Sequence, residues 1–185
     1  MKRLIFLSII ALSLSNCSNK LTNLQLKDYE SIKRLKIGMP LKSAIKYAER
    51  KYYVKKTEIL VFEDKKKKFD YIVYKDESKK TVLFSFSSGH DNQTQDKVFR
   101  IVLKNPLIKT VDGISVGMTV KELKEKSKLK SADFNNDDGL FIISDKFDGG
   151  FLMDISTIKD EKYNYEAPQI NTLPNEMKIK AIILF

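Results

Sequence analysis

The chain has 185 residues, of which 42% are hydrophobic and 10% aromatic, and its formal net charge is +10 at pH 7. This composition excludes an intrinsically disordered protein, and a single cysteine excludes a disulfide within the chain. The positive charge comes almost entirely from lysines spread along the whole sequence, the arginines being Arg3, Arg34, Arg50 and Arg100. Because surfaces that clamp phosphates and read bases favour the planar fork of arginine, we expect no nucleic-acid partner.

The first residues have the order of an export signal. A basic start, Met1-Lys2-Arg3, precedes an apolar run of eleven residues at 4–14 and then Ser15-Asn16-Cys17. A helix needs about twenty residues to cross a bilayer, so this run is too short for a transmembrane anchor. The pattern therefore predicts a secretory signal that is removed from the mature protein.

The residues around the cysteine make this prediction more specific. Leu14-Ser15-Asn16-Cys17 resembles the lipobox of bacterial lipoproteins, although Asn16 stands where that family prefers Gly, Ala or Ser. The resemblance implies that Cys17 receives diacylglycerol, that residues 1–16 are cleaved off, and that the new amino terminus is acylated. Because several acyl chains hold a protein firmly on a membrane, we expect stable anchoring through a tether at 17–30. The alternative is an ordinary secretory signal with an incidental cysteine.

The residue after the cysteine bears on the destination. Ser18 follows Cys17, and in the sorting logic of lipoproteins the absence of Asp at that position points to the outer membrane. We therefore expect a lipid-anchored protein of the bacterial cell envelope, in the outer membrane.

A repeat with a period of about eighty residues organises the rest of the chain. Gly38-Met39 corresponds to Gly117-Met118, 79 residues later, and the run at 97–103 corresponds to the run at 178–184, 81 residues later. Two anchors with nearly the same offset predict a duplication. We place the first repeat at 31–104 and the second at 105–185.

Each copy is expected to open with a helix and to continue with strands. In the first copy, apolar residues at helical spacing follow Pro40, which suits a first helical turn. In the second, Thr119 and Glu122 form a capping-box pattern that starts a helix at Val120. Strand-like runs between turn signals lie at 57–63, 69–74, 81–86 and 97–103, and then at 130–134, 140–144, 151–155 and 178–184.

The short connections between these runs imply antiparallel neighbours. The predicted fold is therefore α+β, with two tandem repeats, each a helix packed on a roughly four-stranded antiparallel sheet. The two sheets would lie side by side or share a seam.

The turns that open the two helices also carry a resemblance. Gly38-Met39-Pro40 and Gly117-Met118-Thr119, after a lipobox and a short tether, resemble the small outer-membrane lipoproteins of the SmpA/OmlA type. The tandem helix-on-sheet arrangement resembles beta-lactamase inhibitory protein. The SmpA/OmlA proteins have one unit, so the resemblance only suggests a role in assembling outer-membrane proteins, and a shared fold does not transfer function.

Candidate chemistry is sparse in this sequence. His90, the only histidine, lies in a polar loop near Ser85, Ser87 and Ser88, where a solvated side chain is the expected state. The run at 133–139 spaces oxygen ligands as an EF-hand does, but glycine is seventh rather than sixth and Ser144 stands where a glutamate is needed. We therefore interpret it as a hairpin turn, and we expect no catalytic residue, no metal and no cofactor.

A long polar stretch at 157–176 precedes the last predicted strand. It contains Tyr163 and Tyr165, and aromatic residues are common at protein interfaces, so these tyrosines are the candidate partner-binding residues. The alternative is that they pack the loop onto the body of the protein.

These observations lead to one functional hypothesis and two alternatives. The first is a non-enzymatic, membrane-anchored envelope lipoprotein that binds a protein partner or acts as a scaffold. The alternatives are an envelope enzyme acting on cell-wall or polysaccharide material, and a carrier of a small apolar or anionic ligand. An enzyme needs a concave pocket with convergent polar groups, a carrier needs an enclosed apolar pocket, and a protein-binding module needs a flat face with aromatics and methionines.

Overall fold

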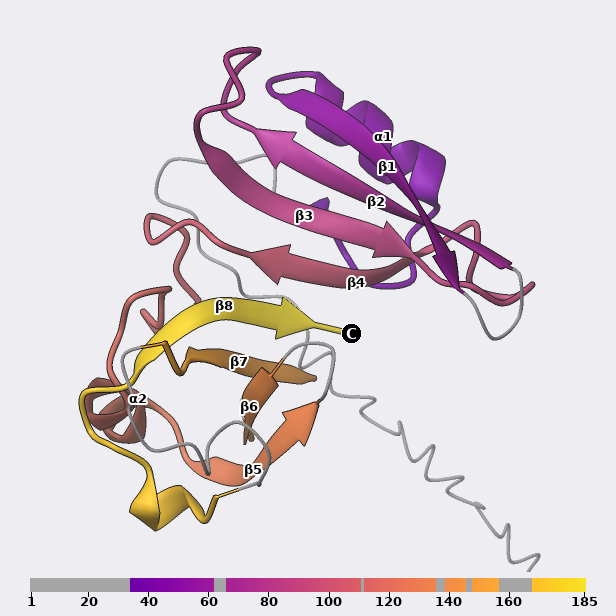
Figure 1. Cartoon of the computed structure of the whole chain (residues 1–185). Coiled ribbons are helices and arrows are strands. Elements are labelled where there is room, and N and C mark those ends of the chain that lie inside the picture. Colours follow the sequence, from indigo (N-terminus) through magenta and orange to yellow (C-terminus); the bar gives the residue numbers. More distant parts are fainter. Residues whose placement is uncertain (1–33, 62–65, 111, 136–138, 146–147, 157–167) are drawn as a thin grey trace, which may run out of the picture.

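The computed structural model describes residues 34–61, 66–110, 112–135, 139–145, 148–156 and 168–185. They form two α-helices, one short 3-10 helix and eight strands (Figure 1). In chain order these are α1 (Leu41–Glu49), β1 (Tyr53–Val61), β2 (Lys66–Tyr74), β3 (Val82–Ser88), β4 (Val98–Leu103), α2 (Val120–Lys126), β5 (Leu129–Asn135), β6 (Gly139–Ser144), β7 (Gly149–Asp154), η3 (Ile170–Thr172) and β8 (Lys178–Leu184).

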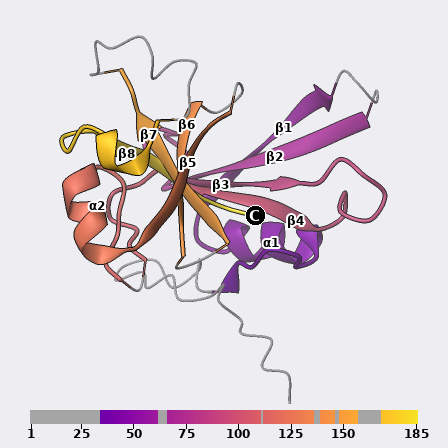
Figure 2. The ribbon, with the colours of Figure 1, turned by 90° about the horizontal axis from the view of Figure 1, so that it is seen from below.

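All eight strands belong to one antiparallel sheet with the order β1-β2-β3-β4-β8-β7-β6-β5. The first four strands and the last four meet where β4 pairs with β8, through Ile101 with Leu184, Val102 with Ile183 and Leu103 with Ile182. Figure 2 shows how strongly the sheet twists, so that β1 and β2 fan away from β5, β6 and β7.

The predicted pair of tandem units, each a helix on its own four-stranded sheet, is wrong. The strands form a single eight-stranded sheet, and the two α-helices are only nine and seven residues long. The protein is α+β only in the broad sense that it contains both α-helices and β-strands. The boundary between residues 104 and 105 stays a prediction.

The physical reason for the single sheet lies in β4 and β8. Ile101 and Leu103 of β4 face the core, while Val102 lies in the opposite apolar cluster with Ile183. Two separate sheets would have left these apolar strands as edges with unpaired backbone groups, and proteins avoid such edges. Pairing β4 with β8 satisfies those groups and joins the halves.

The two glycine turns that precede the helices have matching geometry. Gly38 and Gly117 have φ angles of 77° and 89°, a region that glycine adopts at little cost. Each glycine N–H donates to the last strand of its own half, Gly38 to the oxygen of Val98 at 2.7 Å and Gly117 to that of Ile179 at 2.8 Å. These bonds fix where each helix begins.

Both α-helices cover the same face of the sheet. Ala44 and Ala48 of α1 and Val120 and Leu123 of α2 are buried in one cluster with residues from both halves. The largest fully buried side chains of this core are aromatic and aliphatic, namely Phe84, Phe86, Phe151, Leu83, Ile101, Leu103, Ile108, Ile114, Leu123, Leu140 and Ile142. Tyr71 stacks on Phe86 with ring centroids 5.1 Å apart, and burial raises the pKa of its hydroxyl.

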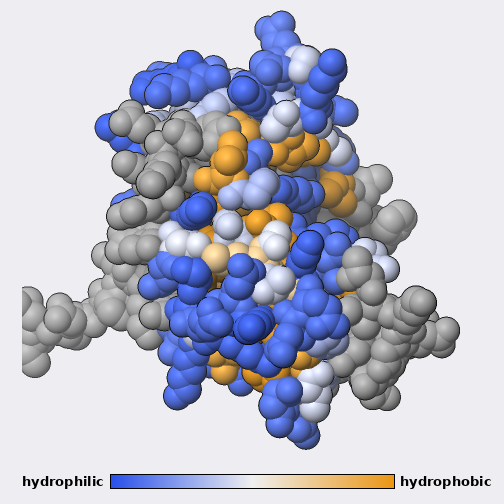
Figure 3. All heavy atoms as spheres, turned by 90° about the vertical axis from the view of Figure 1, so that its left-hand side faces the viewer, coloured by the Kyte–Doolittle hydropathy of each residue, from blue (hydrophilic) through white to orange (hydrophobic). Residues whose placement is uncertain are grey.

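The surface is mostly hydrophilic. Figure 3, which views the left-hand side of Figure 1, shows hydrophilic residues over most of that side and hydrophobic ones in small separate patches. The exposed large hydrophobic residues in the described part of the chain are Ile59, Phe99, Leu107 and Phe185. No helix among the described residues has the length and apolarity that a membrane span requires.

Candidate functional site

The face of the sheet opposite the helices carries polar side chains over its middle strands. Asp70 of β2 is paired with Ser87 of β3, and Ser87 is paired with Arg100 of β4. Directly opposed residues of antiparallel strands share a face, so these three side chains form one row across three strands. A charged residue therefore lies on each side of a serine in the interior of the sheet.

The neighbouring row changes from polar to apolar across the seam. Ser85 is paired with Val102, Val102 with Ile183, and Ile183 with Gly150. Ile183 forms a small second cluster with Leu152 and Ala181, against which Val102 and Phe141 pack. The helix-free face thus carries hydroxyls and charges over β2 to β4. Over β8 and β7 it carries aliphatic side chains together with the exposed Lys180.

Together these rows line a cleft of about 410 Å³ on the helix-free face, which we call the basic cleft. Its lining residues come from five strands and one adjoining loop position, and they are Lys68, Asp70, Ser85, Ser87, Arg100, Val102, Lys104, Leu152, Lys180, Ala181 and Ile183. A cleft of this size falls within the range of small-molecule sites. Its walls are strands of a continuous sheet, which hold side chains more rigidly than loops do.

Burial differs between the base and the rim of the basic cleft. Ser87 is 4% exposed, and Asp70 and Arg100 are half-buried. The Oδ1 atom of Asp70 is buried and receives no hydrogen bond from the described residues. Lys104 and Lys180 are exposed, so they place mobile ammonium groups at the rim.

The electrostatic balance of the basic cleft is positive. Four cationic side chains (Lys68, Arg100, Lys104 and Lys180) and one carboxylate (Asp70) line it, which gives a formal local charge of +3. Like charges gathered in a concave, partly desolvated place attract an anion more strongly than isolated surface lysines do. Arginine adds a planar fork that fits phosphate or carboxylate oxygens. The arrangement can bind an anion, beside aliphatic side chains that are themselves buried, namely Leu152, Ala181 and Ile183.

The lipidation and partner-binding residues singled out in the sequence are not among the described residues. Cys17, Tyr163 and Tyr165 lie outside the described residues, so the lipidation site and the predicted partner-binding tyrosines stay predictions. Part of the 157–176 stretch is described, and there Leu173 is 3% exposed in the core, which fixes this end of the stretch to the body.

His90 is exposed, and it is not among the residues that line the cleft. Its loop is organised by Asp91, whose carboxylate accepts hydrogen bonds from the Thr94 hydroxyl at 2.7 Å and from the Gln93 N–H at 2.7 Å. These bonds lower the pKa of Asp91. The nearby Ser88 hydroxyl accepts a bond from the Phe69 N–H at 3.0 Å. Asp91 and Ser88 thus have structural roles in this loop.

The calcium-like run is partly described. Asn135 and Gly139 are paired at the end of the hairpin between β5 and β6, and the carboxylate of Asp133 accepts a bond from the Phe134 N–H at 2.8 Å. Within the described part of the chain, no cluster of three or more His, Cys, Asp or Glu residues could hold a metal ion.

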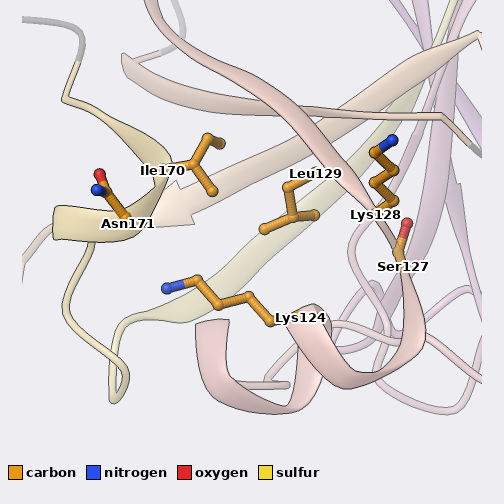
Figure 4. Close-up of a pocket in the computed structure, with 6 residues that line it drawn as sticks. All are labelled: Lys124, Ser127, Lys128, Leu129, Ile170 and Asn171. Atoms are coloured by element: carbon orange, nitrogen blue, oxygen red, sulfur yellow. The ribbon is translucent and has the colours of Figure 1, made fainter.

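A second depression of about 540 Å³ lies beside the end of α2 (Figure 4). It is lined by Lys124, Ser127, Lys128, Leu129, Ile170 and Asn171. In Figure 4, Leu129 and Ile170 face one another across it. The hydroxyl of Ser127 already forms a buried 2.6 Å hydrogen bond with that of Ser144, so it has little capacity left for a ligand. We therefore regard the smaller basic cleft as the better candidate.

Sequence reasoning missed Asp70 and Arg100, although a signal was present. Each is a charged residue within a run that is otherwise apolar or aromatic, Asp70 within Phe69–Tyr74 and Arg100 within Val98–Leu103. Charged residues are depleted in strand interiors unless something requires them. Asp70 and Arg100 lie in one row only because of the register of the strands, and the sequence alone does not define that register.

The fold resembles that of a solved structure. The crystal structure of the uncharacterised protein YfeY from Escherichia coli matches with a TM-score of 0.56 and 17% sequence identity, covering 88% of this chain and 95% of that chain. At this identity the match shows a shared fold and nothing about function. No family model and no curated protein matches the sequence.

Proposed function

We propose that this chain is a non-enzymatic, lipid-anchored module of the bacterial cell envelope that binds an anionic ligand in the basic cleft. The observation that carries the proposal is the convergence of Arg100, Lys104 and Lys180 around one concave site on the helix-free face. The lipobox at Cys17 supports anchoring, and Ser18 supports the outer membrane as the destination.

The shape of the helix-free face favours a ligand site. The sequence had led us to expect a flat face that binds a protein partner. The cleft is concave, and aliphatic, hydroxyl and cationic side chains line it. The methionines of the described residues, Met39, Met118, Met153 and Met177, all pack in or against the core on the helix side. A module of the flat kind would instead present aromatics and methionines outward.

Binding of a protein partner is the second candidate function. Phe99 and Leu107 are 41% and 57% exposed, and exposed large apolar side chains are common in interfaces. The predicted contact through Tyr163 and Tyr165 belongs to this candidate. In-cell crosslinking of the native lipidated protein tests it, because substitution of both tyrosines by alanine should then abolish capture of one recurring partner.

Anion binding is tested on the mature chain, in which Cys17→Ser replaces the residue predicted to carry lipid. This chain is titrated with inorganic phosphate. We expect saturable shifts of backbone amide signals of β3, β4 and β8 in NMR spectra. Arg100→Gln should weaken binding at least tenfold, because a charge-assisted hydrogen bond is lost. Arg50→Gln is the matched control, since Arg50 is exposed at the end of α1. Equal weakening in both variants would refute the basic cleft as the site.

Anchoring is tested separately by metabolic labelling with an alkyne-bearing palmitate. The parent chain should incorporate label and fractionate with the outer membrane, and Cys17→Ser should lose both properties. A Cys17→Ser chain that still carries label would contradict lipidation at this residue.

A further inference from the structure

We infer that β1 pairs with the same strand of a second copy of this chain. The resulting dimer has one continuous sheet of sixteen strands, eight from each copy. The inference goes beyond the proposed anion site and does not depend on it. It follows from an edge of the sheet and from the order of charged residues along that edge.

β1 is an edge strand of the kind that natural proteins usually protect. It stands first in the strand order, and β2 is its one strand partner among the described residues. Its nine residues pair with β2 in an unbroken register from Tyr53 to Val61 and include neither proline nor glycine. A long, regular edge is a template for a further strand, unless a bulge, a proline or a covering element blocks it.

The opposite edge of the sheet has such protection. β5 has seven residues, its register with β6 shifts between Leu129 and Ser131, and η3 lies against it. In Figure 4, Leu129 of β5 faces Ile170 of η3. The edge at which a strand can be added is therefore β1, the outer strand of the fan in Figure 2.

Symmetry restricts how two copies of β1 can pair. Antiparallel copies of one edge are related by a two-fold axis perpendicular to the sheet, and this axis keeps the helix-covered faces of both copies on the same side. Directly opposed residues then share a face. Because side chains alternate along a strand, odd-numbered residues of β1 can oppose only odd-numbered ones, and even-numbered residues only even-numbered ones.

One of the allowed registers matches the charges of β1. When Thr57, the middle residue of the strand, opposes Thr57 of the second copy, Lys56 opposes Glu58 and Glu58 opposes Lys56. All nine residues of β1 then have a partner across the axis. The next allowed register in either direction is centred on Lys56 or on Glu58, and it places two like charges opposite each other, which is destabilising.

The helix-free face of β1 fits the same register. Ile59 is 39% exposed, which is unusual for a large hydrophobic residue of this chain, and the register places it opposite Lys55 of the second copy. The aliphatic stem of a lysine can cover an apolar side chain while its ammonium group stays in water. The two Thr57 side chains, exposed in the single chain, meet at the axis, where a pair of threonines is favourable.

The charged residues can keep the partners that they have within one chain. The Lys56 ammonium lies 3.8 Å from the centroid of the Phe69 ring, and Glu58 also has an interaction in its own chain. An ammonium group has several donors and a carboxylate several acceptor sites, so each can bind a second group across the axis. Because ion pairs between exposed residues are weak and are screened by salt, we expect a reversible dimer that added salt weakens.

The dimer is compatible with the proposed function. The two-fold axis leaves both basic clefts on the same side of the shared sheet, so each copy can still bind an anion. The predicted lipid at Cys17 would confine both copies to one membrane, and this confinement raises their effective concentration.

The first test follows the mass of the mature Cys17→Ser chain by sedimentation equilibrium over a range of concentrations, where we expect a monomer–dimer equilibrium. Lys56→Glu and Glu58→Lys each place like charges opposite each other at two symmetric positions, and each alone should weaken dimerisation about tenfold. The double variant restores opposite charges and should restore the dimer. A mixture of the two single variants should form a heterodimer, because the acidic residues of one chain then oppose the lysines of the other.

Lys55→Glu is the matched control for these variants. It changes the net charge as much as Lys56→Glu does, one residue away, but it opposes Ile59 of the second copy. It should leave the dimerisation constant within about threefold of the parent value. Circular dichroism of each variant checks that the fold is kept.

The second test measures the register by crosslinking. An introduced cysteine is the only one in the Cys17→Ser chain. Thr57→Cys should form a disulfide-linked dimer under mild oxidation, because directly opposed residues have Cα atoms about 4.5–5.5 Å apart, within disulfide range. Lys55→Cys should not, because its two copies lie four positions apart along the strand, or about 13 Å.

Three results would overturn the inference. They are a parent chain that is monomeric at every concentration measured, a dimer that both charge reversals leave intact, and a dimer that crosslinks through Lys55→Cys but not through Thr57→Cys. In the last two cases the copies meet elsewhere or in another register. None of these results bears on phosphate binding in the basic cleft, which Arg100→Gln tests separately.

Discussion

The two faces of the sheet differ in the burial and polarity of their side chains. On the helix-covered face, Phe84, Phe86 and Phe151 are at most 1% exposed and pack in a single core. On the helix-free face, the same or neighbouring strands carry Ser87, Arg100 and Lys180. Because side chains alternate between faces along a strand, one set of strands supplies both the core and the proposed binding surface.

The difference extends to how polar groups are satisfied. On the helix-covered side, the buried hydroxyls of Ser127 and Ser144 form a 2.6 Å hydrogen bond with each other. The Asn105 side chain accepts a hydrogen bond from the Leu107 N–H at 3.0 Å. On the helix-free face, the buried Oδ1 of Asp70 receives no bond from the described residues. A buried polar atom without a partner lowers stability. This contrast agrees with the proposed function, in which the covered face supplies stability and the helix-free face supplies contact with a ligand.

The largest expected effect comes from removing a core aromatic on the covered face. Phe86→Ala should lower the free energy of unfolding by about 3–5 kcal/mol, because it leaves a cavity and removes the stack on Tyr71. Val102→Ala on the helix-free face, where Val102 is half-buried, should lower it by about 1 kcal/mol. Urea denaturation measures both. Equal losses would show that the helix-free face supports the fold as much as the core does.

The sequence was informative about the covered face and its helices. The helix expected at Val120 begins there, and the capping box between Thr119 and Glu122 is present. The strand expected at 178–184 is β8, and the other predicted strands overlap the observed ones. These elements depend on local patterns, such as apolar spacing and cap chemistry, which a single sequence contains.

The sequence was uninformative about how the strands combine. Pairing of Val102 with Ile183 joins residues far apart in the chain, and no local pattern specifies such a partner. The row of Asp70, Ser87 and Arg100 depends on two registers and on the bulges between Val73 and Tyr74 and between Ser87 and Ser88. The sequence therefore contains each residue of the cleft but does not indicate that these residues lie together.

The second prediction concerns the close approach at Gly150 on the helix-free face. An added Cβ would lie 2.3 Å from the Ile142 oxygen and 2.7 Å from the Phe141 ring. Gly150→Ala should therefore lower the free energy of unfolding by about 1–3 kcal/mol, as overpacking does. It should also displace the ring of Phe141. Unchanged stability in thermal and urea denaturation would mean that both the Phe141 ring and the Ile142 carbonyl move away at little cost.

The third prediction concerns the cap of α2 on the covered face. The Thr119 hydroxyl accepts a bond from the Glu122 N–H at 3.2 Å, and the Glu122 carboxylate accepts one from the Thr119 N–H at 2.8 Å. Thr119→Ala should lower the free energy of unfolding by about 1 kcal/mol and leave anion binding unchanged. Weakened binding in this variant would contradict the division of roles between the faces.

The cap also predicts a dependence on pH. The backbone and hydroxyl bonds from Thr119 lower the pKa of Glu122 in the folded state. A carboxylate with a lowered folded-state pKa stabilises the fold above its unfolded-state pKa, and this contribution is lost as the pH falls through the folded-state value. The stability difference between the parent and Glu122→Gln should therefore shrink on acidification from neutral pH. A difference that grows in acid would show that the cap does not hold the charged form.

The smallest expected effect on stability is also the sharpest test of the comparison. Lys104 and Lys180 are exposed at the rim of the basic cleft, and exposed charges contribute little to stability. The double change Lys104→Gln and Lys180→Gln should therefore alter the free energy of unfolding by no more than about 0.5 kcal/mol. Any increase in stability should become smaller in added salt, because salt screens the repulsion between exposed charges. The same variant should bind inorganic phosphate several-fold more weakly. Lys121→Gln with Lys124→Gln on α2 is the matched control, because it removes two cations from the covered side of the molecule. A loss of more than about 1 kcal/mol in the rim variant would mean that these lysines have structural partners, and the helix-free face would then resemble the covered face in being built for stability.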